Sequence, residues 1–310
     1  MATREDDAVR HLLVAHSHDG LLFFTDRGRV FQLKVYELPE VSRTAKGEHL
    51  INLIAIEQRE RVTAIVYVPK GVSRDYMIVA TKKGEVKKTA MDEFEVVRRS
   101  GLIAMDLEED DELIGAKLAH ADDDVLIITA QGKAIRFTVT ELRSASRTSG
   151  GVRGIRLGEG NDRAVSLNLT PKDSELLVVT EKGYGKCTPI DDYPTQSRGG
   201  NGVITLKVTE KTGPVAAARV IGDNDSDLMI ISAGGVVIRM DVGNIIRGGR
   251  AIQGRRMMNL DEGDTVVAVA TTNGKKMDSQ NGLDEEEEAA QDDGGDDEAE
   301  ETSNTDIADV

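Results

Sequence analysis

The sequence predicts an all-β protein of about five four-stranded blades, and two observations support this prediction. Glycines recur in pairs 19 residues apart, and a looser pair is 17 apart: Gly28 and Gly47, Gly132 and Gly151, Gly183 and Gly202, Gly235 and Gly254, and the looser Gly84 and Gly101. The first glycine of each pair separates two short β-rich runs, and glycine readily adopts the positive φ of a tight hairpin. Five copies of one module indicate a repeat architecture.

Each module is predicted to contain a hairpin followed by a second pair of strand-like runs. The hairpins are expected near residues 20–36, 76–90, 125–139, 176–190 and 228–241. The second pair is, for example, 50–56 with 62–68 in the first module and 103–107 with 113–118 in the second. Four strands in modules of 48 to 56 residues match a propeller-type blade.

The two ends of the repeat array are predicted to be incomplete modules. Residues 1–10 are a polar lead-in, and residues 11–15 are expected to form a strand equivalent to 62–68. The last module ends with 266–270, with no further hairpin after it. These half-modules would either close a ring or cap an open spiral. Residues 91–99 are the only helical candidate, and we expect an outer loop there instead.

The net charge of −16 is concentrated in residues 273–310, which contain 15 acidic residues and two lysines. This segment has hardly any large apolar side chains and is predicted to be a disordered acidic tail. The folded domain is expected to span 11–272. No apolar run approaches the ~20 residues of a membrane-spanning helix, and the N-terminus is too polar for a signal peptide. The single cysteine, Cys187, fits a reducing compartment, so we expect a cytoplasmic domain without a membrane partner.

Basic residues recur at two positions of the module. One is the loop before the second glycine, and the other is four residues after the turn glycine, where Gln32 and Cys187 interrupt the pattern. Any one of them could be a solvated loop charge, but repetition would place a basic belt along one edge, suited to phosphates. The candidate ligands of such phosphates are Arg43, Lys46, Lys88, Arg98, Arg99, Arg136, Arg147, Arg153, Arg198, Arg239, Arg247, Arg250 and Arg255.

No catalytic or metal site is predicted. His16 and His18 are the only closely spaced histidines, whereas a metal site needs three or four ligands. Residues 158–160 form a turn, because neither the Lys-Ser/Thr pair nor the helix of a phosphate loop follows. The five tyrosines are expected to be packing residues. We therefore expect no catalytic residue, metal, cofactor or small-molecule substrate in this chain.

The segment Gln196-Ser197-Arg198-Gly199-Gly200-Asn201-Gly202 resembles the seven-residue box Gln-Arg-Arg-Gly-Gly-Lys-Gly of the C-terminal domain of the DNA gyrase A subunit. Five of seven positions match, while Ser197 and Asn201 replace two basic residues. Segments 26–30, 34–36, 83–89, 151–157 and 182–186 are also similar to blades of this family. The resemblance covers about residues 8–272. The family's own box lies in a first blade that would precede this sequence, so the copy here is a degenerate one.

The resemblance implies a β-pinwheel, a propeller-like disc whose rim binds and bends duplex DNA. In gyrase, an ATP-dependent type II topoisomerase, such wrapping supports negative supercoiling, while ATP and Mg²⁺ act elsewhere in the holoenzyme. It further implies as partners duplex DNA, the breakage-reunion domain that carries the catalytic tyrosine, and the gyrase B subunit, in the bacterial cytoplasm. The resemblance also suggests that the acidic tail competes with DNA for the rim. Two alternatives stay open: the equivalent domain of the topoisomerase IV A subunit, and a protein-binding β-propeller.

Overall fold

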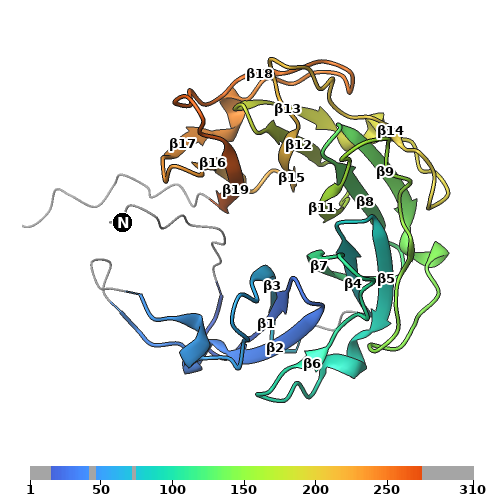
Figure 1. The fold of residues 1–310 in the computed structure, drawn as a ribbon, viewed down its shortest axis with the longest axis vertical. Coiled ribbons are helices and arrows are strands. Elements are labelled where there is room, and N and C mark those ends of the chain that lie inside the picture. Colours follow the sequence, from blue (N-terminus) through green and yellow to red (C-terminus); the bar gives the residue numbers. More distant parts are fainter. Residues whose placement is uncertain (1–14, 42–46, 72–74, 274–310) are drawn as a thin grey trace, which may run out of the picture. The chain divides into compact units, whose positions relative to one another are not determined.

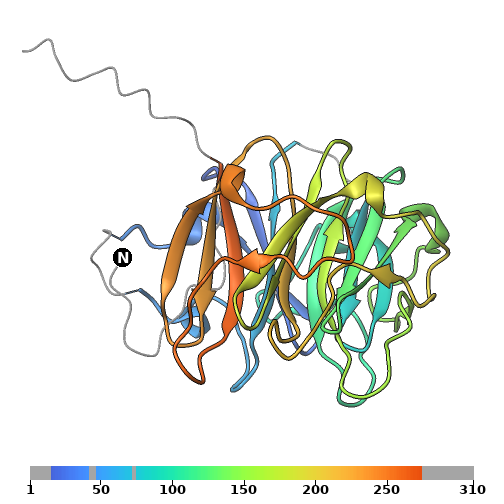
Figure 2. The same cartoon turned by 90° about the horizontal axis from the view of Figure 1, so that it is seen from above.

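Five antiparallel sheets follow one another along the chain in the computed structural model, which describes residues 15–41, 47–71 and 75–273 (Figures 1 and 2). The first compact unit is Met1–Gly274, and the second, Lys275–Val310, lies outside the described residues. Each sheet is one blade, and we name the blades A to E in chain order. The predicted all-β fold of five blades is confirmed. In the described ranges, no helix is both long and apolar enough to cross a membrane.

Blades A to D share one strand order, with a hairpin in the middle of the sheet and a two-residue strand at its outer edge. From the innermost strand outward, blade A contains β3 (Val62–Val68), β1 (Gly20–Thr25), β2 (Arg29–Lys34) and β6 (Leu102–Ile103). Blade B contains β7 (Leu113–Ala119), β4 (Tyr76–Thr81), β5 (Glu85–Ala90) and β10 (Val152–Arg153). Blade C contains β11 (Ala164–Leu169), β8 (Asp124–Thr129), β9 (Lys133–Thr138) and β14 (Val203–Ile204).

Blade D contains β15 (Val215–Ile221), β12 (Glu175–Thr180), β13 (Tyr184–Pro189) and β18 (Arg255–Arg256). Blade E has three strands within the described residues: β19 (Val266–Asn273), β16 (Asp225–Ser232) and β17 (Val237–Asp241). The innermost strands β3, β7, β11, β15 and β19 contact one another in that order, and they lie on the inner side of the arc of blades (Figure 1). Successive blades therefore meet closely along this inner side.

The outermost strand of each four-stranded blade belongs to the next module, so the prediction that one module makes one blade is wrong. β10, for example, follows the hairpin of blade C in the chain but pairs with β5 of blade B, Val152 lying opposite Val86. The predicted strand at 103–107 is likewise reduced to β6, which pairs with β2 of blade A. The backbone hydrogen bonds of these outermost strands thus connect each module to the blade before it.

The turn glycine contributes to this connection between modules as well as to the hairpin. Gly183 has a φ of +77°, and its carbonyl accepts hydrogen bonds from the amides of Met257 (2.8 Å) and Met258 (3.2 Å) in the next module. A Cβ at Gly183 would lie 2.5 Å from the Met258 carbonyl oxygen. The carbonyls of Gly28, Gly84 and Gly132 accept equivalent pairs of bonds. The recurring glycine is therefore required both by backbone conformation and by the close approach of the next segment.

The hydrophobic core consists of layers between neighbouring blades. Leu126 and Ile128 of blade C pack in one cluster with Leu176 and Val178 of blade D. At the other interfaces, the side chains on one face of each hairpin likewise pack against those of the neighbouring blade. The sheets of the middle blades are consequently covered on both faces, as in a propeller.

Two predicted elements differ in the structure. Residues 50–56 contain the 3₁₀ helix η2 (Leu50–Asn52) instead of a strand, and their apolar side chains pack on the face of blade A that points away from blade B, beside Leu21 and Phe23. The helical candidate at 91–99 is reduced to the 3₁₀ helix η3 (Met91–Phe94). Other second hairpin strands end in similar turns: η1 (Val35–Glu37), η4 (Val139–Glu141), η5 (Ile190–Asp192) and η6 (Val242–Asn244). The strand expected at 11–15 falls almost entirely outside the described residues.

Candidate nucleic-acid interface

Three connecting segments run along the outer edge of the blade that precedes them, and we call them the rim segments: residues 142–153, 193–204 and 245–256. Each begins with an isolated parallel bridge to the second hairpin strand, at Lys88–Ser144, Arg136–Thr195 and Cys187–Arg247. Each ends in the short outermost strand, β10, β14 or β18. The labelled strands β14 and β18 lie on the outer side of the arc in Figure 1. The rim segments are therefore the part of each module that faces outward.

One arginine recurs in these segments, four residues before the second glycine: Arg147, Arg198 and Arg250. Arg147 Nη1 donates to the carbonyl of Ile103 (2.8 Å) on β6, and Arg198 Nη1 donates to the carbonyl of Arg153 (3.1 Å) on β10. The backbone amides of these two arginines donate to carboxylate oxygens, Arg147 to Glu93 and Arg198 to Glu141. Each of the two side chains therefore joins its rim segment to the outermost strand of the preceding blade.

Arg247, grouped with this set from the sequence, lies at a different position of the module. Its guanidinium pairs with Glu175 at 3.1 Å and donates to three carbonyls of its own turn, those of Val242, Gly243 and Ile245. Arg250 takes the place of Arg247 in the recurring set. Arg247 therefore closes the turn at the start of its segment.

The second predicted row of cations, four residues after the turn glycine, does not form a surface belt. Lys88 is buried, donates its Nζ to the Val139 carbonyl (3.0 Å) and lies over the ring of Tyr76. Arg136 pairs with Asp124 at 2.8 Å and donates to the Ile190 carbonyl at 3.2 Å. Val139 and Ile190 are equivalent first residues of η4 and η5, so this position fixes the turn of the following blade. In blade E, Arg239 makes the equivalent pair with Asp227 of its own hairpin, but it stays exposed.

Two buried lysines that the sequence reasoning missed hold the rim segments from inside. Lys87 Nζ donates to the carbonyls of Ser146 (3.1 Å), Arg147 (2.6 Å) and Ser149 (2.8 Å). Lys186 Nζ donates to the equivalent carbonyls of Gly249 (2.8 Å) and Arg250 (3.0 Å). Burial lowers the pKa of both lysines to about 8. The sequence did contain a signal for these two lysines. Three residues after the turn glycine, other copies have an apolar residue, such as Phe31 or Ile135, where these two copies have a lysine.

Besides the buried Lys88, seven of the predicted cations have no carboxylate within 4.0 Å among the described residues. Five of them are exposed, and Arg147 and Arg250 are half-buried: Arg98, Arg99, Arg147, Arg153, Arg198, Arg250 and Arg255. Four exposed cations in or just beyond the rim segments were not predicted: Arg143, Arg156, Lys207 and Arg256. Arg43 and Lys46 lie outside the described residues. The outer edge therefore presents free positive charge from successive modules.

A family model described as DNA gyrase C-terminal domain, beta-propeller, matches the chain five times, once for each module. The matched residues are 21–69, 75–120, 123–171, 174–221 and 226–273. The chain belongs to this family. Each match pairs a hairpin with the inner strand that follows it, so the family's repeat is the sequence module and not the four-stranded sheet.

Relatives and solved structures agree with this assignment. The A subunit of DNA gyrase from Dehalogenimonas lykanthroporepellens is 47% identical over 276 residues, which cover 87% of this chain and 34% of the relative. The A subunit of DNA gyrase from Mycolicibacterium smegmatis is 43% identical over 269 residues, covering 86% and 32%. The chain thus spans about a third of the length of these relatives. A solved C-terminal domain of DNA topoisomerase IV aligns with a TM-score of 0.76 at 25% identity, covering 88% of this chain and 84% of that one. A solved DNA gyrase A C-terminal domain aligns at 0.72 and 22% identity, covering 85% and 89%.

The degenerate box of this gyrase-family domain, residues 196–202, forms the end of the second rim segment. Gly199 and Gly202 have positive φ, and the Gly199 amide donates to the carbonyl of Gly154 (2.6 Å), the residue directly after the preceding rim segment. Ser197, Arg198 and Asn201 are exposed, whereas the glycines are half-buried. The glycines therefore let the two segments approach closely. The two basic residues that the box has lost would have stood at outward-facing positions.

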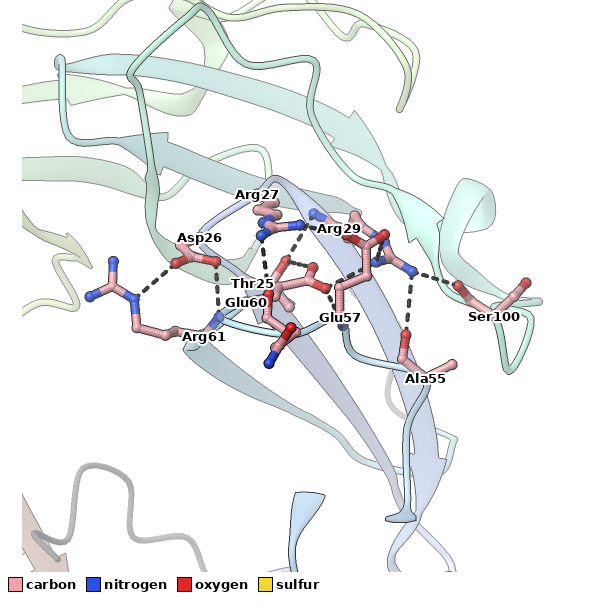
Figure 3. A network of polar contacts seen from close by, with 10 residues as sticks. Thr25, Asp26, Arg27, Arg29, Ala55, Glu57, Glu60, Arg61 and Ser100 are labelled. Atoms are coloured by element: carbon pink, nitrogen blue, oxygen red, sulfur yellow. Dashed lines mark hydrogen bonds and ion pairs between the residues drawn. The ribbon is translucent and has the colours of Figure 1, made fainter. Parts of the chain in front are cut away.

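Blade A of the gyrase-family domain carries a cluster of arginines whose charges are already neutralised (Figure 3). Arg29 pairs with Glu57 (3.1 Å) and with the buried Glu60 (3.0 Å), and it also donates to the Ser100 carbonyl. Arg27 pairs with Glu57, and Arg61 with Asp26 at 2.9 Å. These arginines hold the segment before β3 against the hairpin of blade A, in contrast to the free cations of the rim.

Proposed function

We propose that this chain binds duplex DNA along its rim segments and bends it, as the C-terminal domain of the A subunit of a DNA gyrase. The observation that carries the proposal is the row of exposed, carboxylate-free cations on successive rim segments, such as Arg153, Arg198 and Arg255. Cations repeated along a curved edge neutralise successive phosphates of one duplex. The glycine-rich turns between them add backbone amides that suit phosphate oxygens.

Bending a duplex site of 20–30 base pairs by 40–90° costs on the order of 1–6 kcal/mol. Phosphate contacts distributed over several blades offset that energy, and each neutralised phosphate contributes about −0.9 to the slope of log affinity against log salt. Within the described residues, no α-helix is present that would enter a major groove and read base edges. We therefore expect binding with little sequence preference.

A salt titration of affinity on two unrelated duplexes tests the proposal. Arg153→Gln is the test variant, because Arg153 is exposed on β10 without a carboxylate partner among the described residues. Arg163→Gln is the control, because Arg163 is already paired with Glu181 at 3.1 Å. We expect Arg153→Gln to reduce the magnitude of the salt slope by about 0.9 on both duplexes. The control should leave it unchanged. A large affinity gap between the duplexes at equal salt, or equal slopes for both variants, would contradict the proposal.

The role in the whole enzyme is part of the same proposal. The domain supports ATP-dependent negative supercoiling without catalysing strand passage, together with the breakage-reunion domain and the gyrase B subunit in the bacterial cytoplasm. No cofactor is assigned to this chain, since ATP and Mg²⁺ would act elsewhere in the holoenzyme. Relatives named as the A subunit of gyrase, at 41–47% identity, favour gyrase over topoisomerase IV, whose fold is equally similar. A wrapping assay on relaxed plasmid separates the two, because only the gyrase domain is expected to constrain positive writhe.

A further inference from the structure

The innermost strands of the five blades line a cavity of about 560 Å³. Four consecutive residues of each strand contribute: 62–65 of β3, 114–117 of β7, 165–168 of β11, 216–219 of β15 and 267–270 of β19. This volume lies within the ~300–1,000 Å³ typical of small-molecule sites. Each lining strand is the terminal strand of its sheet, so its inner edge has no strand partner within the described residues. We call this space the axial cavity.

Two cations and no carboxylate line the axial cavity. Lys117 of β7 and Arg219 of β15 are its only charged lining residues, and neither forms an ion pair among the described residues. The two positions are equivalent. Leu113 pairs with Thr81 and Val215 with Thr180 at the same point of their blades, and each cation follows four residues later.

The residue at the same register in the blade between them is Asn168. Its amide nitrogen donates to Ser166 Oγ (2.7 Å), and its oxygen accepts from the Val220 amide (3.3 Å). The neutral Asn168 is thus fixed by internal bonds and leaves the two positive charges uncompensated. Burial and, to a smaller extent, the charge of Arg219 lower the pKa of Lys117 to about 8. Two like charges that share a cavity without a counter-charge favour a bound anion.

We propose that the axial cavity is a binding site for a small multivalent oxyanion of the phosphate class, held between Lys117 and Arg219. The ammonium and the guanidinium supply charge-assisted hydrogen bonds to its oxygens, and arginine suits the geometry of such groups. Unpaired backbone amides of the inner strand edges add further donors. The site lies at the opposite edge of each blade from the rim segments, so it is independent of the proposed DNA interface.

Isothermal titration of the full chain with pyrophosphate, in a low-salt chloride buffer, tests this site. Wild type should bind one pyrophosphate per chain. Lys117→Met and Arg219→Gln should each weaken binding by about tenfold or more, as expected for loss of a charge-assisted hydrogen bond. Lys172→Met is the matched control, because Lys172 is exposed and does not line the cavity, and it should bind as wild type does.

Two further measurements distinguish binding in the axial cavity from binding on the rim and from a loss of folding. Saturating duplex DNA should leave pyrophosphate binding unchanged, whereas displacement by DNA would show that the anion binds on the rim and would overturn the proposal. Absence of one-to-one binding, or equal affinity in wild type and both variants, would overturn it as well. Thermal unfolding of Lys117→Met checks the fold, and removal of a half-buried charge should leave its melting temperature at or above that of wild type.

Discussion

The guanidinium of Arg198 donates to the backbone carbonyl of Arg153, 45 residues earlier in the chain, at 3.1 Å. Arg147 makes the equivalent bond to Ile103 at 2.8 Å. Each bond joins one rim segment to the outermost strand of the blade before it. The outward-facing cations are therefore attached to a row of segments that are linked side to side, which keeps their spacing fixed for a ligand with a regular array of charges.

Arg198 is expected to act both through this bond and through its charge, and two substitutions separate the roles. Arg198→Gln removes the charge, so the magnitude of the salt slope of DNA affinity should fall by about 0.9. Arg198→Lys retains a charge but loses the planar fork, so its salt slope should stay close to wild type. Both should lower the free energy of unfolding by about 1 kcal/mol or less, since the side chain is exposed. Equal salt slopes for the two variants would show that the charge of Arg198 does not contact DNA.

Lys186 should make stability depend on pH above neutrality. Burial lowers its pKa to about 8, against ~10.4 for lysine in an unfolded chain. Between these values the unfolded state binds more protons than the folded state, so the contribution of this residue to stability rises with pH. The full change corresponds to up to about 3 kcal/mol.

The measurement is urea unfolding of wild type and Lys186→Met from pH 7 to 10. The difference in unfolding free energy, wild type minus variant, should increase across this range. The charge of Asp192 raises the pKa of Lys186 and that of Arg250 lowers it, so neither residue is mutated in this experiment. A difference that does not vary with pH would contradict the lowered pKa.

Glu60 is expected to stabilise blade A far more than its neighbour Glu57. Its side chain is fully buried, accepts from Thr25 Oγ1 at 2.6 Å and pairs with Arg29 at 3.0 Å. Glu60→Gln would leave Arg29 with the exposed Glu57 as its one carboxylate partner among the described residues, and loss of the buried charge-assisted bond should lower the unfolding free energy by about 1.5–3 kcal/mol. Glu57→Gln is the control at an exposed pair, where about 1 kcal/mol or less is expected. Similar losses in denaturant titrations of both variants would mean that the buried carboxylate has no special role.

The sequence predicted the hairpins well because a turn glycine between apolar runs is a local signal, as at Gly132 and Gly183. It could not predict which sheet the outermost strands join. Val152–Arg153 is only two residues long, and nothing in those residues identifies Glu85 and Val86 as partners. Non-local pairing of so short a strand depends on the packing of two whole blades.

The candidate interface was predicted only in part, for a related physical reason. Equivalent spacing in neighbouring modules predicted a belt at Lys88 and Arg136. Alternation along a strand indicates exposure only when one face of the sheet is solvated. Here both faces of the middle blades are covered, so Lys87 and Lys88 are both buried despite pointing in opposite directions. The exposure of Arg153 and Arg198 is not subject to this ambiguity, because both lie on rim segments, outside the covered part of the sheet.

The two roles of the turn glycines lead to a prediction with an internal control. At Gly183 a side chain would require a positive φ and would also meet the Met258 carbonyl. At Gly160 φ is also positive, +80°, but no atom lies within 4 Å of the added Cβ. Gly160→Ala should therefore lose about 1–2 kcal/mol, from backbone conformation alone. Gly183→Ala should lose clearly more in the same thermal or urea unfolding experiment, and equal losses would show that the contact with the next module adds nothing.

The acidic tail is expected to weaken DNA binding by competing for the same cations. Residues 278–310 contain 15 acidic side chains and no basic one, and the preceding strand β19 ends at Asn273. Deletion of 274–310 therefore leaves every described strand intact, and it should increase DNA affinity at low salt. The gain should shrink as salt rises, because added salt screens the attraction between the tail and the rim. A control chain in which the same acidic residues are replaced by Asn and Gln keeps the length and should behave like the deletion. If the deletion tightens binding but the neutralised tail does not, the tail acts by occupying space and not by its charge.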